Sequence, residues 1–305
     1  MSDIQNRIDG RPIIASVSGG KDSTAMCLYF KEKGLSYHPV FIDTGWENKQ
    51  TYRFLREYLP EKIGEIEWIR ASVELPPEKE EIALAFEARL GHYSAMLRTI
   101  LKKGYFPRRF GRWCTQELKT YIIRDYLKGI DCEPINAVGI RSAESRARSK
   151  LSEWEYCDTY ECDIWRPLID WSEEDVIEIH SRHSILPNPN YLNGSTRVGC
   201  WPCVFARKEE IRNLAEVDPE RIALLKDLEE VVTEIARVRY RKRNDKELES
   251  PSSWFSCRRL NRAMPIQEAV EWSKTKRGGL QYELFAAPQR EQGCMRWGLC
   301  DVGKE

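Results

Sequence analysis

A six-residue loop near the amino terminus limits what this chain can fold into more than any other feature. An apolar run at residues 13–17 ends at this loop, and the residues after it, to position 33, have apolar side chains at helical spacing. A strand, a glycine turn and a helix in this order direct backbone N–H groups and the positive end of the helix dipole to one point. The loop is predicted to bind phosphate, and it reads Ser18-Gly19-Gly20-Lys21-Asp22-Ser23.

The residue types in the loop suit an anion accompanied by a metal ion. Glycines let the backbone approach the phosphate oxygens, Lys21 adds a positive charge, and the hydroxyl of Ser23 can donate a hydrogen bond. Asp22 is predicted to hold magnesium or to order the loop. The string differs from the GxxxxGK[ST] loop of P-loop ATPases, so the γ-phosphate chemistry of molecular motors is not the default expectation.

Strands and helices alternate along most of the chain. The alternation predicts an α/β fold: a doubly wound, mostly parallel sheet with right-handed crossovers and ligands at the carboxyl ends of its strands. Strands are expected at residues 13–17, 38–42, 66–70, 135–140 and, because proline bounds it, as an edge strand at 164–168. Helices are expected at residues 23–33, 49–58, 78–103, 117–127 and 172–183, with one long helical region from 203 to about 242.

Charged residues follow two of these strands where the loop should lie. Asp43 comes directly after the second strand, and Gly139 and Arg141 end the strand at 135–140, with Arg146 a few residues later. Because carboxyl ends of parallel strands share one edge, these residues are expected beside the loop. Guanidinium groups there would meet phosphate or sulfate oxygens.

These segments resemble the PP-loop adenine nucleotide α-hydrolases, whose loop has the pattern SGGxDS. Three later segments are similar to the phosphoadenosine phosphosulfate (PAPS) reductase family within that superfamily, and the similarity covers roughly residues 11 to 205. Among the members of that family, the chain most resembles the ATP pyrophosphatases of DNA phosphorothioation in type. The later segments are Phe41-Ile42-Asp43-Thr44-Gly45 with Thr51-Tyr52-Arg53-Phe54, Gly139-Ile140-Arg141 with Glu144-Ser145-Arg146, and Arg166-Pro167-Leu168-Ile169-Asp170-Trp171.

The resemblance implies a domain organisation and a ligand. It places a PP-loop (HUP-like) nucleotide-binding domain at residues 1–205 and a helical, irregular, cysteine-containing extension at 206–305. ATP with Mg²⁺ is the expected cofactor. Catalytic roles are expected for Lys21, Asp22, Arg141 and Arg146. Nucleotide contacts are expected from Ser18, Gly19, Gly20, Lys21, Asp22, Ser23, Asp43 and Gly139.

Ten cysteines are unevenly spaced along the chain. No apolar run of signal-peptide or membrane-spanning length is present, which predicts a cytoplasmic protein without membrane contact, where disulfide frameworks are rare. Cys200 and Cys203 form a CxxC turn, and Cys114 lies upstream. A thioredoxin-like motif would begin the helix after the first strand, so metal binding is favoured here.

The same resemblance implies the nature of the metal. Adenosine phosphosulfate (APS) reductases and DNA phosphorothioation proteins carry an iron-sulfur cluster in comparable segments. The expected ligands are therefore Cys114, Cys200 and Cys203, with Cys300 as the fourth and Cys257 and Cys294 as its alternatives. Zinc is the competing metal. The third interpretation is that no metal is bound and these cysteines are buried free thiols that pack in the core. Structural roles are expected for Cys27, Cys132, Cys157 and Cys162.

Whole-chain charge does not point to a partner, because Lys plus Arg and Asp plus Glu both number 48. Local clusters do. Arginines with aromatic residues between them suit a nucleic-acid backbone with stacked bases, although a solvated helix end is the alternative interpretation. The clusters are Arg108, Arg109 and Arg112, and Arg237, Arg239, Arg241, Lys242 and Arg243, with Tyr105, Phe106, Trp113 and Tyr240 interleaved.

The leading functional hypothesis is an ATP pyrophosphatase that activates an acceptor for sulfur transfer, with a cysteine desulfurase as sulfur donor. DNA phosphorothioation is its most specific form, and transfer-RNA thiolation is another. The first alternative is a PAPS or APS reductase that releases sulfite. Against it, APS reductases have paired cysteines where this chain has Cys114-Thr115, and their Glu-Cys-Gly tail motif is absent here. The second alternative is a non-catalytic nucleotide-binding subunit of a complex.

Overall fold

The computed structural model describes residues 3–244, 250–257, 261–276, 281–282 and 297. Its centre is a six-stranded sheet in the order β3-β2-β1-β4-β6-β5. All neighbouring strands pair in parallel except β5 and β6. The doubly wound, mostly parallel α/β fold is thereby confirmed. The strands are β1 (Ile13–Val17), β2 (His38–Ile42), β3 (Glu67–Ile69), β4 (Ile135–Val138), β5 (Trp154–Cys157) and β6 (Cys162–Trp165).

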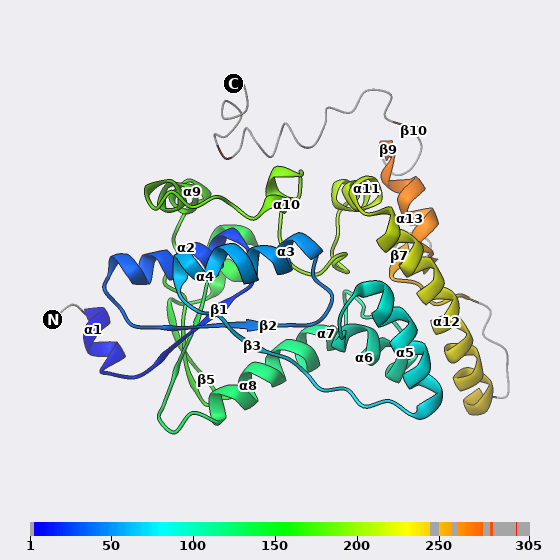
Figure 1. The fold of residues 1–305 in the computed structure, drawn as a ribbon, viewed down its shortest axis with the longest axis horizontal. Helices are drawn as coiled ribbons and strands as arrows, with labels where there is room; N and C mark the ends of the chain where they lie inside the picture. Colours follow the sequence, from blue (N-terminus) through cyan, green and yellow to red (C-terminus); the bar gives the residue numbers. More distant parts are fainter. Residues whose placement is uncertain (1–2, 245–249, 258–260, 277–280, 283–296, 298–305) are drawn as a thin grey trace.

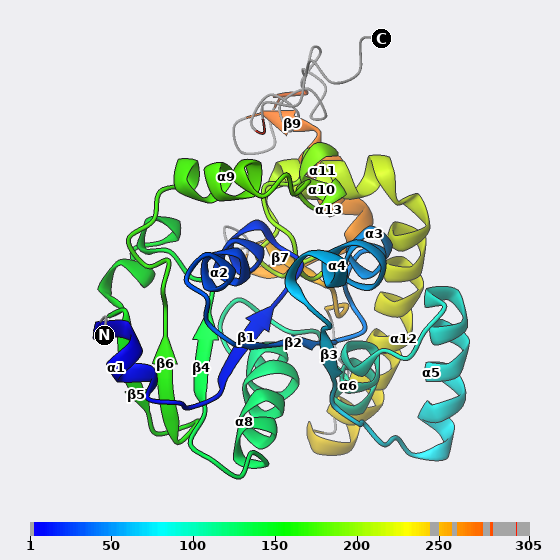
Figure 2. The same ribbon diagram turned by 60° about the vertical axis from the view of Figure 1, so that its left-hand side comes forward.

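Helices cover both faces of the sheet, and the alternating side chains of β1 show why (Figures 1 and 2). Ile13 and Ala15 pack into one apolar cluster with α2, η1, α4 and α9, whereas Ile14 packs into another with α8. A strand that is apolar on both faces is buried from both sides. These elements are α2 (Lys21–Glu32), α3 (Lys49–Arg53), the π-helical turn η1 (Phe54–Tyr58), α4 (Leu59–Ile63), α8 (Tyr121–Lys128) and α9 (Glu173–Arg182).

The edge strand differs from the prediction. The strand expected at 164–168 is β6, which ends at Trp165 and lies inside the sheet, and Pro167 follows its end. The true edge is β5, which pairs antiparallel with β6 and stacks Trp154 on Trp165 with 4.8 Å between ring centroids. Strand β5 was not predicted, because its two central residues, Glu155 and Tyr156, are exposed and it has no buried apolar run.

Two predicted long helices are each broken in the structure. The stretch 78–103 forms α5 (Pro77–Leu90) and α6 (Ala95–Lys103), because Gly91 ends the first with φ of +80° and the Ser94 side chain caps the second. The region after Cys203 forms α11 (Lys208–Val217) and α12 (Pro219–Asn244), with Pro219 as the first residue of the second helix.

A third group of helices lies beside the sheet. Leu97 and Ile100 of α6 share one apolar cluster with Leu225 and Leu228 of α12 and with Ile266 of α13 (Ile266–Ser273). Apolar contacts therefore cross the predicted boundary at 205/206, and that boundary itself stays a prediction. Small strands complete this part: β7 (Phe255–Cys257), β8 (Arg262–Met264), β9 (Thr275–Lys276) and β10 (Gln281–Tyr282).

The remaining elements are short. Within the described part of the chain, no helix is both long and apolar enough to cross a membrane. The short elements are α1 (Asp3–Ile8), α7 (Trp113–Thr115), the π-helical turn η2 (Gln116–Thr120), the 3₁₀ turns η3 (Ser142–Glu144) and η4 (Arg148–Lys150), and α10 (Pro189–Leu192).

Candidate functional site

The predicted loop lies at the carboxyl end of β1 and leads directly into α2, whose first residue is Lys21. Gly19 has φ of +72°, a conformation that favours glycine, and its position is packed against Thr51 and Leu55. The hydroxyl of Ser23 accepts a hydrogen bond from Ser18 N at 3.1 Å and donates one to Gly20 O at 3.0 Å. Ser23 thus closes the loop upon itself.

Two buried cations share the carboxylate of Asp22. Lys21 Nζ lies 3.2 Å from Asp22 Oδ2 and 3.4 Å from Glu173 Oε1 at the start of α9. Arg141 Nε donates to the other oxygen of Asp22. Lys21 is 9% exposed and Arg141 is 5% exposed. Lys21, Asp22 and Arg141 are therefore brought together as predicted, and the loop carries two positive groups in a poorly solvated position.

Gly139 lets β4 approach the first turn of α2. A Cβ atom at Gly139 would lie 2.7 Å from Asp22 O and 2.8 Å from Ser23 Cα. Only a residue without a side chain fits such a backbone contact. The contact delivers the chain after β4 to the loop, and Arg141 reaches Asp22 as a result.

The predicted Arg146 is placed differently from Arg141. It is exposed in the turn between η3 and η4, where its carbonyl accepts a hydrogen bond from Ser149 Oγ at 3.0 Å. Glu144 bonds the backbone N–H of Arg141 at 3.0 Å and the side chain of Arg148. Within this turn, Arg148 is the arginine that pairs with Glu144.

Asp43 follows the end of β2 and belongs to a buried carboxylate pair, whose second member, Glu47, was not predicted. Asp43 Oδ1 accepts hydrogen bonds from Gly45 N and the Tyr52 hydroxyl, both at 2.8 Å. Glu47, which is 2% exposed, lies 2.9 Å from the same hydroxyl. Burial and the two carboxylates raise the pKa of Tyr52, so the phenol stays protonated. Glu47 follows Asp43 closely in sequence, yet its polarity alone predicts a surface position.

Helix α10 closes the loop from the other side, and it was not predicted. The Tyr191 hydroxyl accepts from Lys21 N at 3.1 Å, and Asn188 Nδ2 donates to Gly19 O at 3.0 Å. Asn190 Nδ2 donates to Thr51 Oγ1 at 2.9 Å, which ties α10 to α3. The run Pro187-Asn188-Pro189-Asn190 is typical of a turn, and that signal could have marked a cap without revealing its partner.

Three predicted metal ligands, Cys114, Cys200 and Cys203, border one apolar cluster near the half-buried Lys119. Cys114 lies on α7, and Cys200 pairs with Glu47 in an isolated antiparallel bridge. The pKa of Lys119 is raised by Cys200 first and also by Glu47, Cys203 and Cys114, while burial lowers it. Burial raises the pKa of Cys200 to about 12. The three thiols therefore lie within range of the charge of Lys119.

The thiol site has a donor set that suits a soft metal centre. Thiolates favour zinc or iron-sulfur centres, and Lys119 would offset their negative charge. Over the described ranges, no group of three or more Cys, His, Asp or Glu side chains is arranged to hold a metal ion. Cys257 on β7 borders the same apolar cluster as these three cysteines. Cys294 and the predicted fourth ligand Cys300 lie outside the described residues.

The other cysteines lie in varied surroundings. Cys27 and Cys162 are buried in the clusters that flank the sheet, and burial raises the pKa of each thiol. Cys157 is partly buried on β5, whereas Cys132 is exposed. Packing roles thus suit Cys27 and Cys162 best.

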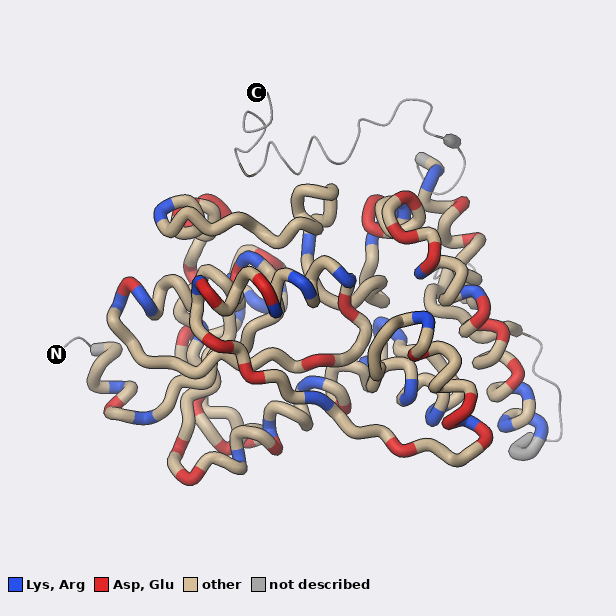
Figure 3. The backbone as a smooth tube through the Cα atoms, in the orientation of Figure 1, with Lys and Arg blue, Asp and Glu red and all other residues tan. Residues whose placement is uncertain are grey.

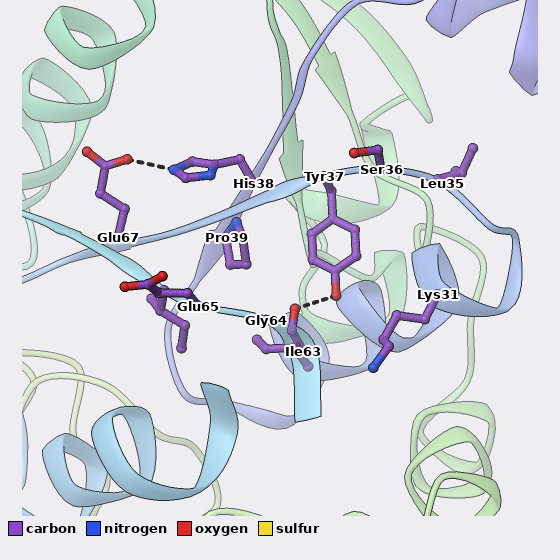
Figure 4. Close-up of a pocket in the computed structure, with 11 residues that line it drawn as sticks. Lys31, Leu35, Ser36, Tyr37, His38, Pro39, Ile63, Gly64, Glu65 and Glu67 are labelled. Carbon is purple, nitrogen blue, oxygen red and sulfur yellow. Dashed lines mark hydrogen bonds and ion pairs between the residues drawn. The ribbon is translucent and has the colours of Figure 1, made fainter. Parts of the chain in front are cut away.

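A hollow of about 720 Å³ lies at the amino ends of β2 and β3, on the edge opposite the loop (Figure 4). His38 Nε2 and Glu67 Oε2 face each other there at 2.6 Å, and the Tyr37 hydroxyl donates to Ile63 O at 2.7 Å. None of the predicted site residues lines this hollow. The chemistry-bearing groups instead meet at the carboxyl edge, where ligands of doubly wound sheets bind.

Comparison with known families identifies the core of the chain. The model of the phosphoadenosine phosphosulfate reductase domain matches residues 12–206. An uncharacterized 37.8 kDa protein of Escherichia phage 186 is 32% identical over 94% of this chain and 96% of its own length.

Two more distant similarities are also found. The adenosine 5'-phosphosulfate reductase of Mycobacterium tuberculosis is 22% identical over 54% of this chain, a match that spans 56% of the reductase. The crystal structure of phosphoadenylyl-sulfate (PAPS) reductase from Candida auris, a phosphate complex, has 18% identity and a TM-score of 0.43, covering 62% of this chain and 81% of that one.

Proposed function

Because the chain belongs to the phosphoadenosine phosphosulfate reductase domain family, we propose that it binds ATP at the loop of residues 18–23 and cleaves it to release pyrophosphate. The proposal rests above all on one observation: the buried cations Lys21 and Arg141 converge on Asp22 in that loop. Two poorly solvated positive groups at a helix N-terminus suit the triphosphate, the most highly charged part of this nucleotide.

The residues at the loop would act mainly through electrostatics. Lys21 and Arg141 are held in place before the nucleotide arrives, so they can stabilise charge that develops on the phosphate oxygens without reorganising. Asp22 is the carboxylate nearest to these cations, and it would contact the Mg²⁺ that accompanies ATP. Mg²⁺ supplies Lewis-acid stabilisation of the phosphate charge when bound. Tyr191 holds the backbone of Lys21 so that the loop keeps its shape.

The proposed reaction transfers adenylate to an acceptor. An acceptor oxygen attacks the α-phosphorus, the bond from that phosphorus to the bridging oxygen breaks, and pyrophosphate leaves with its electron pair. The terminal sulfur of a persulfide on a partner cysteine desulfurase then attacks the activated phosphorus, and AMP leaves with the acceptor oxygen. A second thiol next attacks the donor sulfur of the S–S bond, which leaves the transferred sulfur on the phosphorus and the two thiols joined as a disulfide. We propose a nucleic-acid phosphate as the acceptor, which makes DNA phosphorothioation the specific form of the activity.

A matched pair of lysines on α2 tests the role of the loop. Lys21→Ala should reduce pyrophosphate release from ATP and Mg²⁺ by about 10²- to 10³-fold, the usual effect of removing one electrostatic contact to a transition state. Lys31→Ala, at the exposed end of the same helix, should leave the rate near that of the wild type. Unchanged pyrophosphate release by Lys21→Ala would contradict the proposal.

A parallel assay separates the activity from that of a reductase. The same anaerobic protein is given APS or PAPS with reduced thioredoxin, and sulfite is measured. Sulfite without pyrophosphate would establish the reductase alternative. Tight ATP binding with neither product would establish a non-catalytic nucleotide-binding subunit.

We also propose that Cys114, Cys200 and Cys203 hold an iron-sulfur cluster, with Cys300 as the fourth ligand. The apolar cluster that all three thiols border, with the charge of Lys119 nearby, supports it. Anaerobically purified wild-type protein should contain iron and acid-labile sulfide, and Cys200→Ser should lose both. Cys132→Ser, at an exposed thiol, is the matched control and should keep them. Zinc in place of iron would support the competing metal.

A further inference from the structure

Two basic segments that are far apart in sequence lie side by side in the fold. Arg239 of α12 donates from Nη1 to Lys103 O at 2.6 Å, and its guanidinium lies 5.9 Å from the ring centroid of Tyr105. Gly104 makes this approach possible, because a Cβ atom there would lie 2.8 Å from Ile235 Cγ2. The segment 105–112 and the α12 segment 237–241 therefore form one surface, called the basic-aromatic surface below.

Positive charge dominates this surface. Figure 3 shows lysine and arginine gathered at the carboxyl end of α12. Glu234 pairs with Arg237, and Glu117 pairs with Lys103. Burial lowers the pKa of Lys79, Glu78 raises it and Arg239 lowers it, so both a carboxylate and the guanidinium of Arg239 lie near this lysine. The exposed arginines of the surface are Arg108, Arg109, Arg112, Arg237, Arg239 and Arg241.

Exposed rings lie among these arginines. Phe110 is 85% exposed, and Tyr105 and Tyr240 are each 36% exposed. Phosphate groups would pair with the arginines, while unpaired bases would stack on the rings. A duplex would keep its bases away from Phe110, so the combination favours a single strand.

The surface adjoins the thiol site. Arg109 Nε donates to Val204 O at 3.2 Å, next to Cys203, and Arg112 is the N-cap residue that precedes α7, which carries Cys114. The guanidinium groups of Arg109 and Arg112 both lie over the ring of Phe205, at 5.8 and 5.4 Å. A strand on this surface would pass beside the cysteines.

We propose that the basic-aromatic surface binds an unpaired segment of nucleic acid and presents it to the site that contains Cys114 and Cys203. Recognition is by phosphate charge and base stacking, so it tolerates many sequences. That this strand is also the acceptor of sulfur rests on the proposed function, whereas its binding does not.

Binding of a fluorescent single-stranded oligonucleotide, measured by anisotropy over a range of salt concentrations, tests the surface in the full-length protein. Arg108→Ala and Arg237→Ala should each reduce the slope of log affinity against log salt by about 0.7, the value for one lost phosphate contact to a single strand. Phe110→Ala should weaken binding roughly 5- to 150-fold and leave the slope unchanged, because stacking releases no counterions.

Lys226→Ala is the matched control for Arg237→Ala. Both residues lie on α12, both side chains are 49% exposed, and each pairs with a glutamate of the same helix. The Lys226→Ala variant should show the same slope of log affinity against log salt as the wild type. Without nucleic acid, water takes the place of the acceptor oxygen, and all four variants should hydrolyse ATP to AMP and pyrophosphate at the wild-type rate. A failure of the surface assignment is therefore distinguishable from failure of the proposed function.

Three outcomes would overturn the surface assignment. In the first, Arg108→Ala and Arg237→Ala show the same slope of log affinity against log salt as the control Lys226→Ala, so neither arginine contacts a phosphate. In the second, duplex DNA binds more tightly than the single strand. In the third, vesicles containing phosphatidylserine bind while the oligonucleotide does not, which would identify a membrane-binding surface instead.

Discussion

Close backbone contacts set the position of the reactive groups at the scale of single residues. Asp22 can pair with both Lys21 and Arg141 because β4 comes near the first turn of α2 at Gly139. Another buried acid, Glu229, lies on α12. Its two oxygens accept from Trp254 N at 2.8 Å and Ile266 N at 2.9 Å, so one side chain on α12 orders two later segments.

Gly139→Ala should weaken the protein and its nucleotide binding together. A methyl group there must displace the first turn of α2, and overpacking of this kind costs about 1–3 kcal/mol in the free energy of unfolding. Denaturant unfolding and ATP titration measure the two effects. Gly129→Ala is the control, because its Cβ would meet only backbone oxygens at 3.4 Å or more. If Gly139→Ala and Gly129→Ala bind ATP equally well, the contact between Gly139 and the first turn of α2 does not position the loop.

Glu229 should make stability depend on pH. Burial raises its pKa from 4.5 to about 7, so the folded protein binds more protons than the unfolded chain between these values. The free energy of unfolding should therefore fall by about 3 kcal/mol as pH rises from below 4.5 to above 7. Comparing thermal or denaturant unfolding of wild type and Glu229→Gln isolates this effect. If the two stability curves run parallel over this pH range, the assignment is wrong.

At the scale of elements, the segment after β2 joins three parts of the molecule. Trp46 O accepts from Trp201 N at 2.8 Å, which ties the segment to the cysteine turn. The ring of Trp46 stacks on Trp254 with the ring centroids 5.1 Å apart, and the guanidinium of Arg221 lies 4.7 Å from the centroid of the Trp46 ring. Strand β2, the CxxC turn and α12 thus meet at one fully buried ring.

Trp254→Ala should remove the largest contact in this junction. The ring is 4% exposed and also packs edge-on against Phe106, so its loss should reduce the free energy of unfolding by about 3–5 kcal/mol. Denaturant titration gives the value. Tyr156→Ala on the edge strand, where the ring is 57% exposed, should change stability by no more than about 0.5 kcal/mol. A similar small change for Trp254→Ala would show that the junction contributes little.

Across the whole molecule, the apolar interior is not divided at the predicted domain boundary. One cluster joins α5, α6 and α7 to α11, α12 and α13, and it contains residues from Trp46 to Ala269. The sheet has its own clusters on its two faces. The carboxyl-terminal helices therefore cover the apolar side of the α5–α6 pair, as Figure 2 shows beside the sheet.

A chain cut after residue 205 should expose this side. Without α12 and α13, apolar residues such as Leu97, Ile100 and Leu101 lose their partners, and the fragment should bind an apolar dye and unfold without a sharp transition. Size-exclusion chromatography and thermal melts compare it with the full chain. A monomeric fragment with a cooperative melt would instead support an independent domain at residues 1–205.

Local patterns were sufficient wherever neighbours in sequence set the structure. The apolar run of β1 followed by two glycines predicted the loop, and Ser172 with acids after it predicted α9, whose capping box is present. The fold class followed from alternation of strands and helices. Lys21, Asp22, Asp43 and Arg141 could be expected at one edge because parallel strands end together.

Contacts between distant segments required the folded chain. Tyr191 supports Lys21 from α10, and Glu47 joins Asp43 through Tyr52. Cys114, distant in sequence, borders the same apolar cluster as the CxxC pair. The closeness of β4 to α2 likewise depended on packing at Gly139. Periodicity records which face of an element is apolar, but the partner of that face is chosen by the packing of the whole chain, where burial and charge pairing are satisfied together.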